Sequence, residues 1–277
     1  MLLGLDSYSY HLAFGAHPDF APRRRLTLFK FIAKVRALGL DSFQIDPMHL
    51  ASRSRAHLAE VRVAAAEAGL FLEHGAIGLD PAQLRRELNV CVQLGSPVLR
   101  TFAGFNRHDP RTKVSAEIRR AVANLRKIRP VAADLGVKIA VENHGDLTTD
   151  ELLQVIRAVD SPWVGICLDV GNPMLTLEQP LPAVEKMIAH AFTTHVKDYA
   201  LEQTNYGAKI NGVALGDGCI DLSAVIKVIR RRSALDRIIL EIPVEARPGA
   251  SAREVLHHED DCVRRSVQRA RRLLRSR

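Results

Sequence analysis

VGICLDVGNP, residues Val164–Pro173, is the most informative segment of the chain, because a short apolar run leads directly into a carboxylate and a glycine. A run of this length, rich in β-branched residues and bounded by turn residues, is typical of a buried strand of a parallel sheet. Three further segments share the plan of an apolar run that ends in a residue able to bind a metal ion. They are KIAVENHGD (Lys138–Asp146), FTTHVKDY (Phe192–Tyr199) and IILEIPVE (Ile238–Glu245).

Eight strand candidates occur at fairly regular spacing along the chain. They are LLGLDSY (2–8), SFQID (42–46), LFLEHGAI (70–77), PVLRTFAG (97–104), KIAVENH (138–144), VGICLDVG (164–171), FTTHVKD (192–198) and RIILEIP (237–243). Amphipathic stretches of helical period separate or follow them, at residues 26–38, 54–68, 81–94, 113–135, 149–159, 181–191, 222–233 and 253–274. This alternation predicts βα units with a parallel sheet. Right-handed crossovers close such a sheet into a (β/α)8 TIM barrel of the α/β class.

An open doubly wound sheet is the alternative fold. It usually carries a glycine-rich phosphate turn after its first strand, whereas Ser7-Tyr8-Ser9-Tyr10-His11 follows the first strand here. The length of 277 residues matches one barrel of about 250 residues. We find no low-complexity linker and no shift in composition. The sequence therefore predicts a single barrel domain over residues 1–277, with a basic C-terminal helix at about 253–277.

The formal net charge of +8 invites a nucleic-acid interpretation. The excess is uneven, because the segment Arg264–Arg277 holds seven arginines and no acid. We interpret it as a solvated helix face with a frayed tail, and a surface for polyanions is the alternative. A nucleic-acid partner is not expected. The sequence leaves open whether the chain forms a homo-oligomer.

Targeting signals are not evident in the sequence. Asp6 interrupts the apolar start of the chain, and no apolar run reaches the length of a membrane span. The four cysteines are far apart and form no CxxC pair, which is typical of reduced thiols rather than a disulfide framework. We therefore expect a cytoplasmic protein with no membrane partner.

Four candidate metal ligands stand at the ends of four successive strands. They are Glu142, Asp169, His195 and Glu241. The C-terminal ends of barrel strands surround one mouth, so these side chains are expected to meet there. Three carboxylates and one imidazole suit a divalent metal ion, with Mn²⁺ favoured and Mg²⁺, Co²⁺ or Zn²⁺ as alternatives. Singly, each acid could sit where a strand emerges into water, and His195 could be a satisfied core histidine. Together they favour a metal site.

Other polar residues at the strand ends are predicted to bind substrate. They are Arg100, His144, Asn172, Lys197 and His74. Arg100 and Lys197 are expected to anchor a carboxylate or phosphate, and ion pairs with Glu73 or Asp198 are the alternative.

Two further motifs have structural as well as functional interpretations. The turn Gly216-Asp217-Gly218 could bind phosphate, but capping of the helix near Leu222 is the preferred interpretation. His257-His258-Glu259 is interpreted as surface, because adjacent residues of a helix point to different faces.

The motifs VENHGD, CLDVGN, HVKD, LGDGCID and LEIP resemble the xylose-isomerase-like barrel superfamily, which holds sugar isomerases and epimerases. The resemblance covers nearly the whole chain. It implies a metal site made of Glu142, Asp169, His195 and Glu241. It also implies a small keto-sugar or keto-sugar acid as substrate and an enediolate intermediate. In this interpretation Glu142 and Glu241 are the catalytic pair, one removing a proton and the other returning it.

The chain departs from the ketose epimerases of this superfamily at two positions. Those enzymes carry a histidine where this chain has Asn172, and an arginine where it has Leu201. An isomerase or epimerase remains the leading interpretation. The alternative is a lyase, either decarboxylase or dehydratase, of a 3-oxo sugar acid such as 3-oxo-isoapionate. Less favoured is a non-catalytic barrel that binds sugar or nucleic acid. The DNA-repair branch is disfavoured because no Asp-x-His triplet occurs between Asp198 and Asp221.

Overall fold

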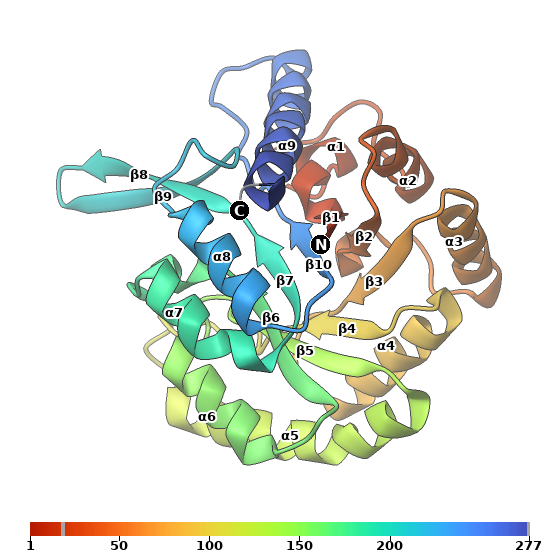
Figure 1. Cartoon of the computed structure of the whole chain (residues 1–277), viewed down its shortest axis with the longest axis vertical. Coiled ribbons are helices and arrows are strands. Elements are labelled where there is room, and N and C mark those ends of the chain that lie inside the picture. Colours follow the sequence, from red (N-terminus) through yellow and green to blue (C-terminus); the bar gives the residue numbers. More distant parts are fainter. Residues whose placement is uncertain (18–19, 276–277) are drawn as a thin grey trace.

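A computed structural model describes residues 1–17 and 20–275 and shows a closed barrel of parallel strands ringed by helices (Figure 1). The strands around the barrel follow the order β1-β10-β7-β6-β5-β4-β3-β2. Their bounds are β1 Leu2–Asp6, β2 Ser42–Ile45, β3 Phe71–Gly75, β4 Val98–Thr101, β5 Lys138–Glu142, β6 Val164–Asp169, β7 Ala191–Val196 and β10 Arg237–Leu240. The prediction of a single (β/α)8 barrel is therefore confirmed.

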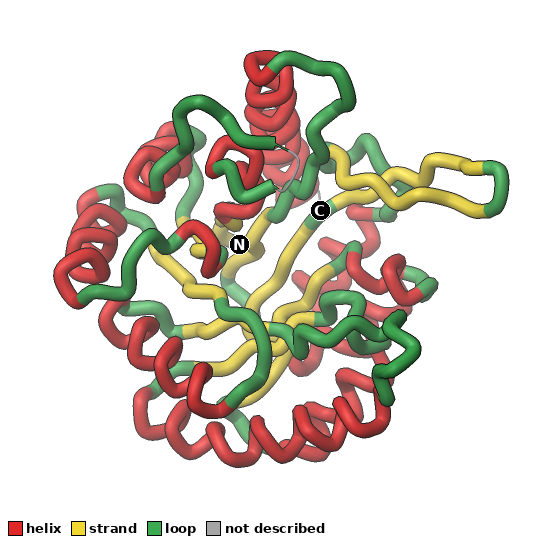
Figure 2. The backbone as a smooth tube through the Cα atoms, turned by 180° about the vertical axis from the view of Figure 1, so that it is seen from behind, coloured by secondary structure: helices red, strands yellow, loops and turns green. Residues whose placement is uncertain are grey.

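The helices form the outer layer, as both views show (Figures 1 and 2). Their bounds are α1 His11–Phe14, α2 Leu28–Ala37, α3 Arg55–Glu67, α4 Pro81–Leu94, α5 Val114–Leu135, α6 Thr149–Val159, α7 Pro180–Met187, α8 Leu222–Arg232 and α9 Ala252–Arg275. Short 3₁₀ turns occur at η1 Ser7–Tyr10, η2 Pro47–His49, η3 Asn172–Thr176 and η4 Ile188–His190. Among the helices described, none has the length and hydrophobicity needed to cross a membrane.

The helix ends follow from local sequence. At the start of α4 the Asp80 carboxylate accepts a hydrogen bond from the Gln83 N–H, and Pro81 occupies the first helical position. Both features stabilise a helix start, because the first N–H groups of a helix lack partners within it. The helix ends at Gly95, whose φ of 78° lies in the left-handed region that glycine tolerates. The helix therefore has the bounds of the predicted stretch 81–94.

An antiparallel hairpin of β8 Asp198–Thr204 and β9 Gly207–Val213 was not predicted. It projects from the barrel between β7 and α8 in both views (Figures 1 and 2). Leu201 and Tyr206 on it are exposed. The first barrel strand is also shorter than the predicted range 2–8. It ends at Asp6, whose side chain accepts from the Tyr8 N–H and caps η1.

The arginine-rich end is more ordered than predicted. Helix α9 continues to Arg275 and buries Val263, Val267 and Leu273 against the core, so the expected frayed tail is wrong as far as Arg275. Residues 276–277 lie outside the described residues. The surface interpretation of His257-His258-Glu259 is also wrong for Glu259. That side chain is fully buried and accepts hydrogen bonds from the backbone N–H groups of Leu12 and Ala13.

Candidate metal centre

The strand register places four ligand-type side chains at one level of the barrel. Asp169 of β6 lies opposite His195 of β7, and Glu142 is the last residue of β5. Glu241 directly follows β10, and its N–H donates to the Val196 carbonyl at 3.1 Å. One ligand atom from each of the four residues lies within 4.8 Å of the others, and all four are buried. The structure thus brings together the four residues proposed as metal ligands.

The imidazole of His195 is oriented by a hydrogen bond from below. Its Nε2 lies 2.8 Å from the Gln44 side-chain carbonyl, so Nε2 carries the hydrogen and donates it. The Gln44 amide in turn donates to Glu73 at 2.9 Å, and Glu73 also accepts from the Thr193 hydroxyl at 2.8 Å. Nδ1 is left facing the carboxylates, at 3.3 Å from Glu142. A hydrogen-bond acceptor on one ring nitrogen, here Gln44, fixes the tautomer of a histidine and leaves the other nitrogen free to bind a metal ion.

Asp169 is held so that one oxygen remains directed at the cluster. Its Oδ1 accepts from the Gly171 and Asn172 N–H groups at 2.8 and 2.7 Å. The Asn143 amide bonds to both the carbonyl and the N–H of Asp169, at 2.8 and 2.9 Å. Gly171 is required here by close approach rather than by a tight turn, since a Cβ would lie 2.7 Å from Cγ of Lys197.

The buried carboxylates fit a divalent cation. Glu142 Oε2, Asp169 Oδ2 and Glu241 Oε2 are shielded from solvent, and none receives a hydrogen bond of acceptable geometry. They are instead balanced by ion pairs with Lys197 and Arg100. Several carboxylates this close together need positive charge beside them. The donor set of three carboxylates and His195 Nδ1 is one that a hard divalent cation accepts.

Two buried cationic side chains contact the same cluster. Lys197 Nζ lies 2.8 Å from Asp169 Oδ2 and also pairs with Glu241. Arg100 Nε lies 2.5 Å from Glu142 Oε2. Lys197 and Arg100 therefore do not form the alternative ion pairs with Glu73 or Asp198.

Asp198 has different partners. Its carboxylate accepts backbone N–H groups of Gly216, Gly218 and Ile220, at 2.9, 3.1 and 3.2 Å. The glycine turn after β9 thus wraps a carboxylate of the chain itself, rather than an exogenous phosphate. The turn does not cap α8 as preferred, because the cap lies three residues beyond Gly218, where the Asp221 side chain accepts the Ala224 N–H.

The pKa values of the carboxylates differ because their neighbours differ. Burial, with Glu142 and Glu241 nearby, raises the pKa of Asp169 to about 6 despite Lys197. Burial also acts to raise the pKa of Glu241, but Lys197 and His195 outweigh it and lower that pKa to about 2. Burial opposes ionisation of Glu142 as well, yet Arg100 and His195 hold its pKa well below the usual range. Both glutamates are therefore ionised at neutral pH, the form that binds a metal ion.

Asn172 and Tyr199 complete the polar wall beside the cluster. The Asn172 amide donates to Glu142 at 3.1 Å, and its oxygen accepts from the Tyr199 hydroxyl at 3.1 Å. Asn172 was predicted for this place and Tyr199 was not. No strong sequence signal marks Tyr199, which lies beyond the end of the predicted strand 192–198.

His144 lies on the loop after β5, where its ring stacks on Phe102 with centroids 4.0 Å apart. Both rings line a pocket of about 470 Å³ formed by the loops that follow β4 and β5. The predicted place of His144 at the mouth therefore agrees with the structure. A larger hollow of about 630 Å³ lies outside the barrel against α8 and Leu273, and no cluster residue lines it.

His74 is not brought to the cluster. Side chains of a strand alternate between faces, and Glu73 occupies the inner face of β3. His74 therefore points outward to the helix layer, where its Nε2 lies 2.8 Å from Glu87 of α4. The prediction that His74 contacts substrate is not supported by this position.

Asp6 is a site residue that the sequence analysis treated only as an interruption of the apolar start. It is 1% exposed, and its Oδ2 lies 3.6 Å from His195 Nε2 without a hydrogen bond. Burial, with Glu241 and Asp46 nearby, raises its pKa to about 8 despite His195. Gln44 was missed as well. The signal for both is a polar side chain at an inward position of an otherwise apolar strand.

Comparison with known proteins agrees with this geometry. The chain is 30% identical over 271 residues to the 3-oxo-isoapionate decarboxylase of Pectobacterium atrosepticum, covering 96% of this chain and 94% of that protein. Among solved structures, a D-psicose 3-epimerase aligns over all of both chains with a TM-score of 0.75 at 17% identity. The IolI protein with a bound zinc atom aligns over 97% of this chain and 99% of that chain, with a TM-score of 0.73 at 16% identity. Residues 32–262 match the family described as xylose isomerase-like TIM barrel. The chain therefore belongs to the xylose isomerase-like TIM-barrel family.

Proposed function

We propose that this chain is a divalent-metal-dependent lyase that decarboxylates a 3-oxo sugar acid. The observation that carries the proposal is the pair of buried cations, Lys197 and Arg100, in contact with the carboxylate cluster. Buried cations beside a reaction centre suit a substrate that carries its own carboxylate. The full-length similarity to a protein named 3-oxo-isoapionate decarboxylase supports the same substrate class.

The chemistry of a 3-oxo acid defines what the site must do. The bond from the α-carbon to the carboxylate breaks, CO₂ leaves, and the bonding electron pair moves into the neighbouring carbonyl as an enolate. A proton then returns to the α-carbon. A divalent cation held by Glu142, Asp169, His195 and Glu241, for which we favour Mn²⁺, would supply Lewis-acid stabilisation of the developing negative charge.

The residues of the chain have separate tasks in this proposal. Lys197 and Arg100 bind and orient the substrate carboxylate through charge-assisted hydrogen bonds. The Asn172 amide and the Tyr199 hydroxyl orient sugar hydroxyls. Burial raises the pKa of Tyr199 well above its usual value, so its hydroxyl stays protonated and is able to donate. His144 and Phe102 form the wall of the adjoining pocket.

A second candidate is an isomerase or epimerase of a keto-sugar. The facing carboxylates of Glu142 and Glu241 favour it, since such a pair can remove a proton on one side and return it on the other. In that reaction no carbon–carbon bond breaks. The two candidates share the metal centre and differ in whether CO₂ is released.

The test is incubation of the Mn²⁺-loaded protein in D₂O with a panel of 3-oxo sugar acids and the corresponding neutral ketoses. The proposal expects CO₂ release from an acid together with one deuterium at the former α-carbon. The Asp169→Asn variant is the control for the metal centre and should release no CO₂ above background. Deuterium exchange into a ketose, with no CO₂ from any acid, would replace the lyase proposal with the isomerase.

A further inference from the structure

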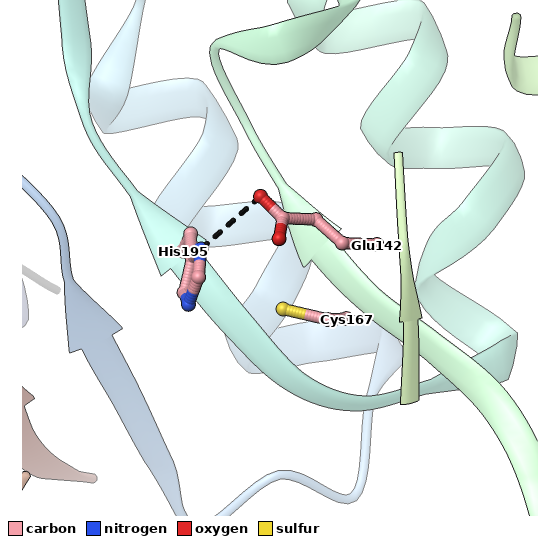
Figure 3. A group of neighbouring side chains, drawn as sticks. All are labelled: Glu142, Cys167 and His195. Atoms are coloured by element: carbon pink, nitrogen blue, oxygen red, sulfur yellow. Dashed lines mark hydrogen bonds and ion pairs between the residues drawn. The ribbon is translucent and has the colours of Figure 1, made fainter. Parts of the chain in front are cut away.

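Cys167 lies directly beneath the metal centre. It precedes Asp169 by two residues on β6, so both side chains face the barrel interior. Its side chain is fully buried, and the register of β5 and β6 places it opposite Glu142. Figure 3 shows its sulfur pointing into the space between Glu142 and His195. The thiol therefore occupies the layer below the oxygen ligands.

The three side chains form a donor set of their own. One ligand atom each of Glu142, Cys167 and His195 lies within 4.8 Å of the others, and all three residues are buried. Glu142 and His195 also belong to the upper set with Asp169 and Glu241. The two donor sets thus share Glu142 and His195. The lower set is completed by the sulfur of Cys167, and the upper set by two further carboxylates.

The chemical class of the donors separates the metals that the two sets prefer. Carboxylate oxygens suit Mn²⁺ and Mg²⁺, whereas a thiolate favours softer ions. One thiolate, one imidazole and one carboxylate are all ligands that Zn²⁺ accepts. Three protein ligands with a fourth position open is a common arrangement of zinc sites.

We propose that Cys167, Glu142 and His195 form a second, deeper cation position that takes soft divalent ions, Zn²⁺ or Cd²⁺, in place of the hard ion above. Because the two positions share Glu142 and His195, only one is filled at a time. On binding, the S–H bond of Cys167 breaks, a sulfur–metal bond forms, and the proton leaves to solvent. The proposal concerns metal binding alone and does not depend on the reaction proposed above.

Cys91 offers a matched control. It is also fully buried, but it lies on α4, where its sulfur is 3.9 Å from the Val98 carbonyl and belongs to no ligand group found among the described residues.

The experiment titrates metal-free protein with Cd²⁺ and records the near-ultraviolet thiolate-to-cadmium charge-transfer band. Wild-type protein should develop the band with one equivalent of Cd²⁺. Cys167→Ser should lack it, and Cys91→Ser should behave as wild type. Loss of an outer-shell partner alone weakens metal binding by about 10- to 100-fold. We therefore expect at least a tenfold loss of Cd²⁺ affinity in Cys167→Ser.

Two further measurements separate the positions. Cys167→Ser should keep its Mn²⁺ affinity within about twofold, which also shows that it folds, because the upper set does not use the thiol. Asp169→Asn should lose Mn²⁺ binding and keep the cadmium band. The proposal is overturned if wild-type protein shows no band, if Cys167→Ser keeps it, or if Asp169→Asn abolishes it in a protein with native circular dichroism.

Discussion

At the scale of single residues, Lys197 distinguishes the two candidate reactions. The residue is 4% exposed, and its ammonium pairs with Asp169 and Glu241. If it binds a substrate carboxylate, Lys197→Met should lower kcat/KM for a 3-oxo acid about 10- to 100-fold, since a hydrogen bond to a charged group contributes roughly 1.5–3 kcal/mol. Steady-state kinetics on an acid and its neutral ketose analogue measure the difference.

Lys209→Met is the matched control for Lys197→Met. Lys209 is exposed on the hairpin and pairs with Glu245, so its removal should leave the kinetics of both substrates unchanged. Equal losses on acid and ketose in Lys197→Met would mean that the lysine supports the metal centre as a whole. That result would count against binding of an anionic substrate.

His49 and His11 predict a dependence of stability on pH. Burial lowers the pKa of His49 to about 3 and that of His11 to about 4. The unfolded chain binds protons at these groups near pH 6.5, before the folded chain does. Stability is therefore lost as pH falls below about 6.5. Each histidine should contribute about 2 kcal/mol of loss between pH 7 and pH 5.

Urea unfolding of wild type and His49→Gln at the two pH values isolates the contribution of His49. The variant should lose about 2 kcal/mol less than wild type on acidification. His257→Gln is the control, because His257 lies exposed on α9. An identical pH response in His49→Gln and wild type would refute a buried neutral His49.

The sequence predicted the place of a side chain correctly where that place depends only on where a strand ends. The end of an apolar run identifies the mouth of the barrel, so Glu142, Asp169 and Glu241 could be expected to meet. It does not show which residues of a strand point into the barrel and which point out to the helices. The sequence therefore could not tell that Glu73 faces inward and His74 outward. The inward-facing partner of Glu73, Thr193, is 120 residues away in sequence.

At the scale of elements, Glu259 joins α9 to α1. Its carboxylate accepts the Leu12 and Ala13 N–H groups at 2.7 and 3.0 Å, and its side chain is fully buried. Glu259→Ala leaves two N–H groups unsatisfied, so it should lower the free energy of unfolding by about 1–3 kcal/mol. Denaturant unfolding at pH 7 measures this. Asp261→Ala, on the exposed face of α9, should stay within about 0.5 kcal/mol of wild type. Comparable losses in both variants would show that Glu259 does not join the helices.

Strands and helices of the barrel follow from local patterns, and the hairpin shows where such patterns fail. Strands such as β5 and β6 are short, mostly apolar runs that are almost entirely buried, a pattern that the sequence alone reveals. In β8 the apolar residues Tyr199, Ala200 and Leu201 are consecutive and are followed by polar ones, so the strand lacks the alternation typical of a hairpin. The two residues of its turn, Asn205 and Tyr206, are not among the usual hairpin turn pairs either. The segment was therefore expected to be a plain βα loop.

At the scale of the whole molecule, closure of the barrel creates the site. Pairing of β1 with β10 completes the ring, and four side chains spread over residues 142–241 then meet within 4.8 Å. The sequence predicts this meeting because it follows from topology alone. The ion pairs of Lys197 and Arg100 with the ligands were not predictable, since they depend on side-chain positions across several strands.

Metal binding should therefore stabilise the whole fold. The unfolded chain does not hold the four ligands together, so an ion that binds only the folded state adds RT ln(1 + [L]/Kd) to the free energy of unfolding. At a free Mn²⁺ concentration a hundred times the Kd, this is about 2.7 kcal/mol. Thermal unfolding with added Mn²⁺ should give a higher Tm than unfolding with a chelator. In Asp169→Asn the two values should converge, because the variant lacks a ligand while its metal-free fold is retained. A Tm of the wild-type protein that does not change between saturating Mn²⁺ and chelator would argue against a metal centre at these four residues.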